Sequence, residues 1–142
     1  MAYNLNQVAM ITGLTTRTLR NHLNKGILKG EKVDGNWSFT DQELEAYMAN
    51  PSVRQAIMAR SHAVIYDFLA NSYKQTNRIC TIMDFPVSTE EALGISQFFS
   101  REICQHGSDI EFRFINERHF ARFILSGSED QVKDLMKTYY NQ

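Results

Sequence analysis

The sequence predicts an α+β protein in three parts: a helical N-terminal part with a β-hairpin, a long helix, and a small C-terminal sheet with two helices. Two short amphipathic helical patterns, joined at Gly13, open the chain. A longer helical pattern follows Pro51 without interruption to about residue 73, and apolar residues alternate as in strands beyond residue 77. We therefore place the boundaries at residues 1–50, 51–74 and 75–142.

The first part begins with two helices and a tight turn. Asn6 is suited to cap a helix that opens at Gln7, and Gly13 supplies the left-handed residue at which that helix ends. Thr15 is suited to cap a second helix, which Gly26 ends. Two amphipathic helices around a glycine turn have the layout of a helix-turn-helix, which predicts contact with DNA.

The outward face of the second helix carries the candidate DNA contacts. Arg17 and Arg20 are three residues apart and project from one side, so one can fork to a guanine edge while the other binds a phosphate. The full set of candidates on this helix is Thr15, Thr16, Arg17, Arg20 and Asn21. The alternative is a solvated helix pair with two ordinary surface arginines.

A hairpin and a third helix follow. Asp34 and Gly35 form a strong hairpin turn, flanked by short arms on both sides. This predicts a wing over residues 32–37, with Lys32, Asn36 and Trp37 as candidate contacts to the DNA backbone. Trp37 either packs on the sugar-phosphate chain or closes the small core beneath the wing, and the second is favoured. Thr40, with Glu43 three residues on, predicts a capping box that opens the third helix.

Together these residues resemble the DNA-binding domain of the MerR family of bacterial regulators and the related excisionase-type winged helices. The resemblance covers the N-terminal third and depends on Val8-Ala9, Thr12-Gly13, Arg17-Thr18-Leu19-Arg20, Gly26-Ile27-Leu28, Gly35, Phe39-Thr40 and Leu44. It implies a recognition helix in the major groove, a wing on the backbone, and a dimer formed through a long helix. Two departures affect the implied phosphate contacts: Asn21-His22 stands where the family usually has two tyrosines, and Asn36-Trp37 stands where an aromatic residue and an arginine are usual.

Charge and helix pattern favour a homodimer. Residues 1–74 hold eight Lys and Arg against six Asp and Glu, and residues 75–142 hold seven against ten. A DNA-binding unit with so small a positive charge gains from presentation in two copies. The long helix carries an apolar stripe with Ile57, Val64 and Phe68, which we take as the candidate dimer contacts. The alternative is that this stripe packs only against its own C-terminal part.

The C-terminal part reads as strand, helix, strand, strand, helix. Residues 71–77 are polar and form the expected linker, so a fragment of residues 1–74 is expected to fold alone. The βαββα order predicts a three-stranded sheet with both helices on one face, similar to a truncated ferredoxin-like unit. Its other face needs a cover, for which a second subunit, the long helix or a ligand are the candidates. A subunit or the long helix is favoured over a small molecule as the cover, and a small-molecule effector or a protein partner at this part of the chain stays open.

Other functions find little support. Cys80 and Cys104 lack metal-ligand spacing and are expected to be buried small hydrophobes. No metal, cofactor or catalytic motif is predicted, so an enzyme is not expected. No apolar run could cross a membrane, and a cytoplasmic protein is expected. The favoured function is a sequence-specific transcriptional regulator that binds double-stranded DNA. Two alternatives stay open: an excisionase-like architectural factor that bends DNA, and an interaction adaptor that has lost DNA affinity.

Overall fold

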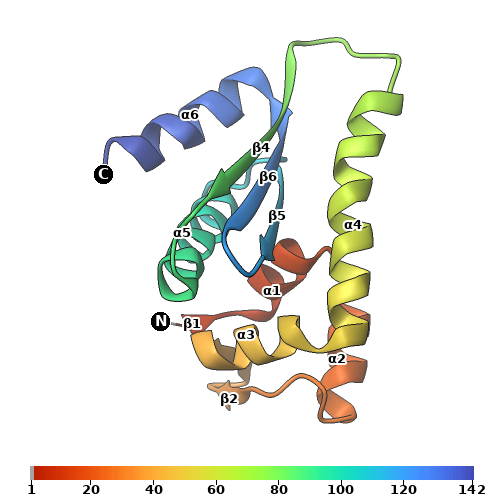
Figure 1. Cartoon of the computed structure of the whole chain (residues 1–142), viewed down its shortest axis with the longest axis vertical. Helices are drawn as coiled ribbons and strands as arrows, with labels where there is room; N and C mark the ends of the chain where they lie inside the picture. Colours follow the sequence, from red (N-terminus) through yellow and green to blue (C-terminus); the bar gives the residue numbers. More distant parts are fainter. Residues whose placement is uncertain (1) are drawn as a thin grey trace.

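The computed structural model describes residues 2–142 and contains both helices and strands, as predicted (Figure 1). The N-terminal elements are β1 (Ala2–Tyr3), α1 (Leu5–Thr12), α2 (Thr16–Asn24), β2 (Glu31–Val33), β3 (Asn36–Thr40) and α3 (Asp41–Ala49). The long helix α4 (Pro51–Ala70) leads to β4 (Arg78–Phe85), α5 (Thr89–His106), β5 (Glu111–Asn116), β6 (Ala121–Ser128) and α6 (Glu129–Tyr140). The strands form two small antiparallel sheets, ordered β1-β3-β2 and β4-β6-β5.

Local capping sets the ends of the first two helices. The prediction that Asn6 caps α1 is wrong, because Asn4 does so: its Oδ1 accepts the N–H of Gln7 at 2.8 Å, and Gln7 Oε1 accepts the N–H of Asn4 at 2.9 Å. Gly13 ends α1 with φ of 78°, as predicted. Thr15 caps α2, as predicted, by accepting the N–H of Thr18 at 3.1 Å.

The predicted hairpin is present. Val33 pairs with Asn36, and the two residues between them have positive φ values, 53° at Asp34 and 83° at Gly35. Positive φ at both central residues is the mark of a type I′ turn, whose twist suits a hairpin. The sequence did not predict β1, a two-residue strand that pairs with β3 on the side away from β2.

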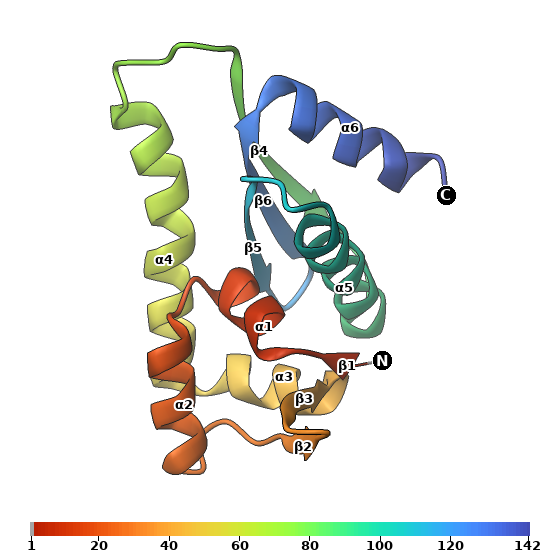
Figure 2. The ribbon, with the colours of Figure 1, turned by 180° about the vertical axis from the view of Figure 1, so that it is seen from behind.

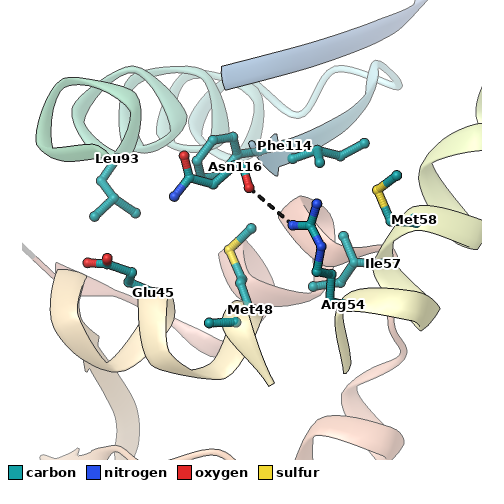
Figure 3. Close-up of a pocket in the computed structure, with 10 residues that line it drawn as sticks. Glu45, Met48, Arg54, Ile57, Met58, Leu93, Phe114 and Asn116 are labelled. Atoms are coloured by element: carbon teal, nitrogen blue, oxygen red, sulfur yellow. Dashed lines mark hydrogen bonds between the residues drawn. The ribbon is translucent and has the colours of Figure 1, made fainter. Parts of the chain in front are cut away.

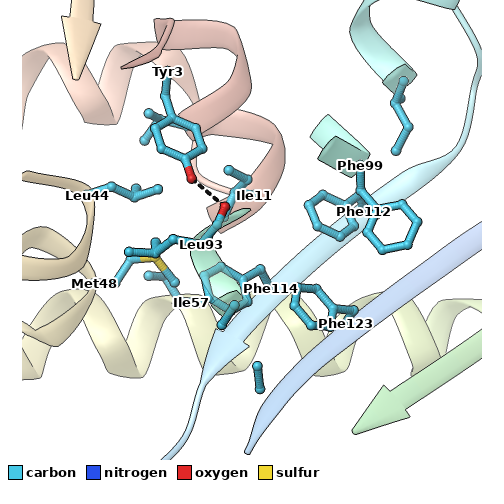
Figure 4. Close-up of a cluster of buried hydrophobic side chains, with 14 of the residues drawn as sticks. Tyr3, Ile11, Leu44, Met48, Ile57, Leu93, Phe99, Phe112, Phe114 and Phe123 are labelled. Carbon is cyan, nitrogen blue, oxygen red and sulfur yellow. Dashed lines mark hydrogen bonds between the residues drawn. The ribbon is translucent and has the colours of Figure 1, made fainter. Parts of the chain in front are cut away.

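The C-terminal sheet has the predicted order of elements. Strand β6 lies between β4 and β5, with Ile82 opposite Ile124 and Phe114 opposite Phe123. One face packs on α5 and α6 through stacked and tilted aromatic rings, among them that of Phe99 (Figure 4). The likeness to a ferredoxin-like unit stays a prediction.

The opposite face of this sheet is covered by α4 of the same chain, as both views show (Figures 1 and 2). Val64 is 4% exposed and packs with Ile115 and Ile124, while Ile57 is 3% exposed within the larger core. Of the three covers that the sequence left open, the long helix is therefore the one found over β5 and β6. Two of the three side chains expected at a dimer interface are buried inside one chain.

The larger of two hydrophobic cores extends across both ends of the chain. It joins side chains of α1 and α3 to those of α5, β5 and β6 (Figure 4). Polar contacts reinforce it: Tyr3 Oη donates to the Leu93 carbonyl at 2.7 Å, and Gln97 Nε2 donates to the Ala2 carbonyl at 2.8 Å. The segment 71–77 is exposed, yet it does not divide two cores. The expectation that residues 1–74 fold alone disagrees with this packing, and the three-part division stays a prediction.

Candidate nucleic-acid interface

Helix α2 presents a polar face to solvent. Leu19 is fully buried and fixes the orientation of the helix, so that Arg17, Arg20 and Asn21 on the other side are exposed. Thr16 is half-buried. The Thr15 side chain is exposed, but its hydroxyl is engaged by the backbone and side chain of Thr18. The side chains of the two arginines are therefore free to contact a ligand, whereas the hydroxyl of Thr15 is already hydrogen-bonded.

The hairpin and α2 share a hollow of about 370 Å³. We call it the α2–hairpin hollow; it is lined by Asn4, Leu5, Asn6, Arg20, Gly35, Asn36 and Trp37. The structure therefore brings three of the predicted contacts together: Arg20, Asn36 and Trp37. The start of α1 lies at the same place, and a helix N-terminus carries a partial positive charge that favours anions. Arg17 and Lys32 do not line this hollow.

Trp37 packs on its own hairpin. Its ring stacks on that of Phe39, with centroids 6.3 Å apart and planes at 16°, and Lys32 Nζ lies 5.3 Å from the Trp37 ring centroid. This is the packing role that the sequence favoured for the tryptophan. The cation–π contact also fixes the exposed Lys32 beside the ring.

His22, one of the departures from the family pattern, connects two helices. Its Nδ1 lies 2.7 Å from Tyr47 Oη on α3, and the two rings meet edge to face at 5.7 Å. Burial raises the pKa of Tyr47 to about 12, so its hydroxyl stays neutral at physiological pH. The side chain at this position therefore orients α2 on α3, a role that the sequence did not reveal because the partner is 25 residues away.

The interface segment is electropositive. Between residues 15 and 37 the chain has five Lys and Arg against two Asp and Glu. Four of the five basic side chains lie outside the α2–hairpin hollow, so the charge is spread over α2, the following loop and the hairpin. A spread of basic groups suits the regularly spaced phosphates of a duplex.

A half-buried arginine connects the helix-turn-helix to the C-terminal sheet. Arg113 on β5 donates from Nη1 to the carbonyls of Met10 at 3.1 Å and Phe112 at 2.9 Å. A β-carbon at Gly13 would lie 2.6 Å from Arg113 Nε and 2.8 Å from Arg60 Cβ, so the turn needs glycine for space as well as for its positive φ. Burial lowers the pKa of Arg113. Arg113 alternates with Phe112 and Phe114 along β5, a pattern that by itself predicts a solvent-facing side chain.

A second hollow, of about 210 Å³, lies between α3 and α4 on one side and α5 and β5 on the other (Figure 3). We call it the junction pocket; it is lined by Glu45, Met48, Ala49, Arg54, Ile57, Met58, Leu93, Phe114, Ile115 and Asn116. Arg54 spans it, donating to the Asn116 carbonyl at 3.1 Å and to Glu117 at 2.8 Å. Most of the lining residues are apolar, and the polar ones are Glu45, Arg54 and Asn116.

The two cysteines lie on different elements, Cys80 on β4 and Cys104 on α5. Cys80 is half-buried and Cys104 is exposed on α5, so the expectation of burial is wrong for Cys104. Over residues 2–142 both thiols are free, and no three side chains of His, Cys, Asp or Glu gather as metal ligands. No helix in that same range is both long and apolar enough to cross a membrane.

Comparison with known proteins agrees with the geometry of the N-terminal part. Residues 3–46 match a family model described as MerR HTH family regulatory protein. Neither the curated proteins nor the solved structures contain a match to this chain. The matched residues span β1 to α3 and include α2 and the hairpin. The N-terminal segment is thus similar to the helix-turn-helix of MerR regulatory proteins, which confirms the resemblance seen in the sequence.

Proposed function

We propose that the protein is a sequence-specific, DNA-binding transcriptional regulator. In this proposal α2 enters the major groove and the β2–β3 hairpin acts as a wing against the backbone. The observation that carries the proposal is the exposed pair Arg17 and Arg20, held on a helix that Leu19 anchors, inside a segment that matches a regulatory family. Regulators of this kind are typically not enzymes, and we propose no catalytic role, metal or cofactor.

The two arginines receive different roles. Arg20 lies in the α2–hairpin hollow beside the start of α1, which suits a phosphate. Arg17 is free of that hollow and is assigned to a base edge in the groove, with Thr16 and Asn21 beside it. Lys32 and Asn36 are assigned to the backbone through the hairpin. Thr15 contributes mainly by capping α2.

We further propose that the protein acts as a cytoplasmic homodimer in a bacterium. A single unit carries little net positive charge, and two half-sites bound together raise affinity without any new contact. Ile57 and Val64 are already buried in the monomer, so a dimer must use other surfaces. Phe68 is partly exposed, with Lys74 Nζ 4.4 Å from its ring centroid.

A binding selection tests the assignment. Genomic fragments retained by the protein are sequenced, and affinity for the selected site is then measured over a range of salt concentrations. R17A should cost about 1–3 kcal/mol at that site and blur the preference at one base pair, whereas R20A should weaken binding to all sequences and lower the salt slope by about one unit. K133A, which removes an exposed charge on α6, serves as the matched control.

The same selection separates the alternatives. Clustered direct repeats without a palindrome, together with bending of the bound DNA, would instead indicate an excisionase-like architectural factor. Equal affinity of wild type, R17A and R20A for every fragment would contradict the DNA assignment. That result would instead support the alternative in which the protein is an interaction adaptor without DNA affinity.

The junction pocket is our candidate for an effector site. Its apolar wall suits the hydrocarbon part of a small amphipathic carboxylate, whose charged group would replace Glu117 as the partner of Arg54, and the pocket touches both the N-terminal helices and the C-terminal sheet (Figure 3). Benzoate is a suitable probe. It should raise the midpoint of thermal unfolding of the wild type more than that of R54M, and equal shifts would contradict the assignment.

A further inference from the structure

Strand β4 is an edge strand with one side open. All eight of its residues pair with β6, and β6 in turn pairs with β5, so nothing in the described chain pairs with the outer side of β4. In Figure 1 the strand lies in front of β6, with α4 and α6 to either side and no element across it. Its outward-facing N–H and C=O groups are therefore available to another strand.

Strand β4 has few of the features that usually protect an edge strand from pairing. Strand β4 has neither proline nor lysine among its residues, and Ile82 is 48% exposed. Ile82 also lies opposite Ile124, which belongs to the small core under α4, so the apolar surface beneath that helix continues to the open edge. The only charges on the strand are Arg78 at its start and Asp84 near its end.

We propose that β4 pairs antiparallel with β4 of a second copy of this chain, about a two-fold axis at Thr81. This joins the two C-terminal sheets into one sheet of six strands. Arg78 then lies opposite Asp84 of the second copy, Ile79 opposite Met83, and Cys80 opposite Ile82, and each pair occurs twice by symmetry. The inference rests on the homodimer of the proposed function and names its interface.

Charge and side-chain direction select this register. A two-fold axis perpendicular to the sheet keeps the same faces together, so only residues of equal parity can lie opposite each other. Moving the axis to Cys80 sets Arg78 against Ile82, and moving it to Ile82 sets Arg78 against Pro86, which has no N–H. Only the axis at Thr81 pairs the two opposite charges. Asp84 stays bound to Arg122 of its own chain at 2.7 Å and can accept from both arginines.

Cysteine cross-linking in the full chain tests the register. In a C80S/C104S background, T81C should form a disulfide dimer on mild oxidation, because the two Thr81 residues face each other across the axis. M83C is the matched control, since Met83 lies on the same face and is equally half-buried. The two copies of Met83 would be four residues out of register, about 13 Å apart, so M83C should not cross-link.

A charge reversal tests the energetics. R78D sets two carboxylates opposite each other at both ends of the interface, and should raise the dimer dissociation constant about tenfold in sedimentation or light scattering. R118D, with the same charge change in the exposed β5–β6 turn, should leave it unchanged. Circular dichroism of each variant verifies that the fold is retained.

Three outcomes would overturn the inference: a monomer at all concentrations, a dimer in which T81C does not cross-link, or equal cross-linking of T81C and M83C. The second outcome would instead favour a dimer interface on the solvent side of α4, where Tyr66 and Leu69 are exposed. None of these results depends on DNA. Failure of the regulator assignment would appear separately, as equal DNA affinity of R17A and wild type.

Discussion

At the scale of single residues, Arg113 contributes to stability through a polar contact between distant parts of the chain. The Met10 carbonyl lies in the last turn of α1, where backbone acceptors lack helical partners, and Arg113 supplies the donor. Arg113→Met keeps the length of the side chain but leaves two carbonyls without that donor. We expect a loss of about 2 kcal/mol in the free energy of unfolding, measured by urea titration. Arg118→Met, at an exposed site, should change it by less than about 0.5 kcal/mol.

The buried tyrosines predict a loss of stability in alkali. The folded pKa of Tyr47 is raised from 10.0 to about 12, and burial raises that of Tyr3 as well. For a group whose pKa is raised on folding, the stabilisation is complete below the unfolded pKa and disappears as the pH rises through the folded one. The free energy of unfolding should therefore fall between pH 10 and 12, with a slope of up to about 1.4 kcal/mol per pH unit for each group.

Urea titrations at several pH values measure that slope. Tyr47→Phe should flatten it, whereas Tyr66→Phe, at an exposed site, should leave it as it is. An equal slope in wild type and Tyr47→Phe would contradict the assignment to Tyr47.

Residue roles were predictable from the sequence where the partner is close in the chain. Thr40 and Glu43 form the predicted capping box because they are three residues apart in the chain. The Asp34-Gly35 turn was predictable because this residue pair readily adopts the two positive φ values that the turn requires. His22 and Arg113 were not predictable, since their partners lie 25 and 103 residues away. Periodicity placed Arg113 on a polar side of its strand and could not show that α1 covers that side.

At the scale of elements, two glycines predict opposite effects of the same substitution. Gly35 has φ of 83° in the hairpin turn, so Gly35→Ala should destabilise the protein by about 1 kcal/mol and weaken DNA binding through a loosened hairpin. Gly94 lies inside α5 with open space around it, and Gly94→Ala should stabilise by about 0.5–1 kcal/mol. Thermal unfolding of the two variants measures both signs. Equal shifts would contradict the role of backbone conformation.

Element boundaries and element partners differ in how well the sequence predicts them. The pattern of α4 correctly predicted a long helix after Pro51 and an apolar stripe. A stripe shows that a face is buried but not what covers it, and here the cover is the sheet of the same chain. The strand β1 was missed because two residues are too few for an alternating pattern.

At the scale of the whole molecule, the continuous core predicts cooperative unfolding. Residues 1–74 without the rest would expose Tyr3, Ile11 and Ile57, which the full chain buries almost completely. We expect the full chain to unfold in one transition, and the 1–74 fragment to show weak helicity by circular dichroism and to bind a hydrophobic dye. A fragment that unfolds with a sharp transition of its own would support the division into three parts instead.

The arrangement of α2 has a consequence for how DNA preference can change over evolution or by engineering. Arg17 and Asn21 are exposed on the outer face of α2 and Thr16 is half-buried there, whereas Leu19 and His22 hold the helix in place. A library randomised at those three positions should therefore retain the melting temperature of the parent while yielding members with new target sites. Helix α1 has no such freedom, because the C-terminal sheet packs directly on it. A change of DNA preference thus requires substitutions on only one surface of one helix. Exchange of the C-terminal region for another would require α1 to be redesigned as well.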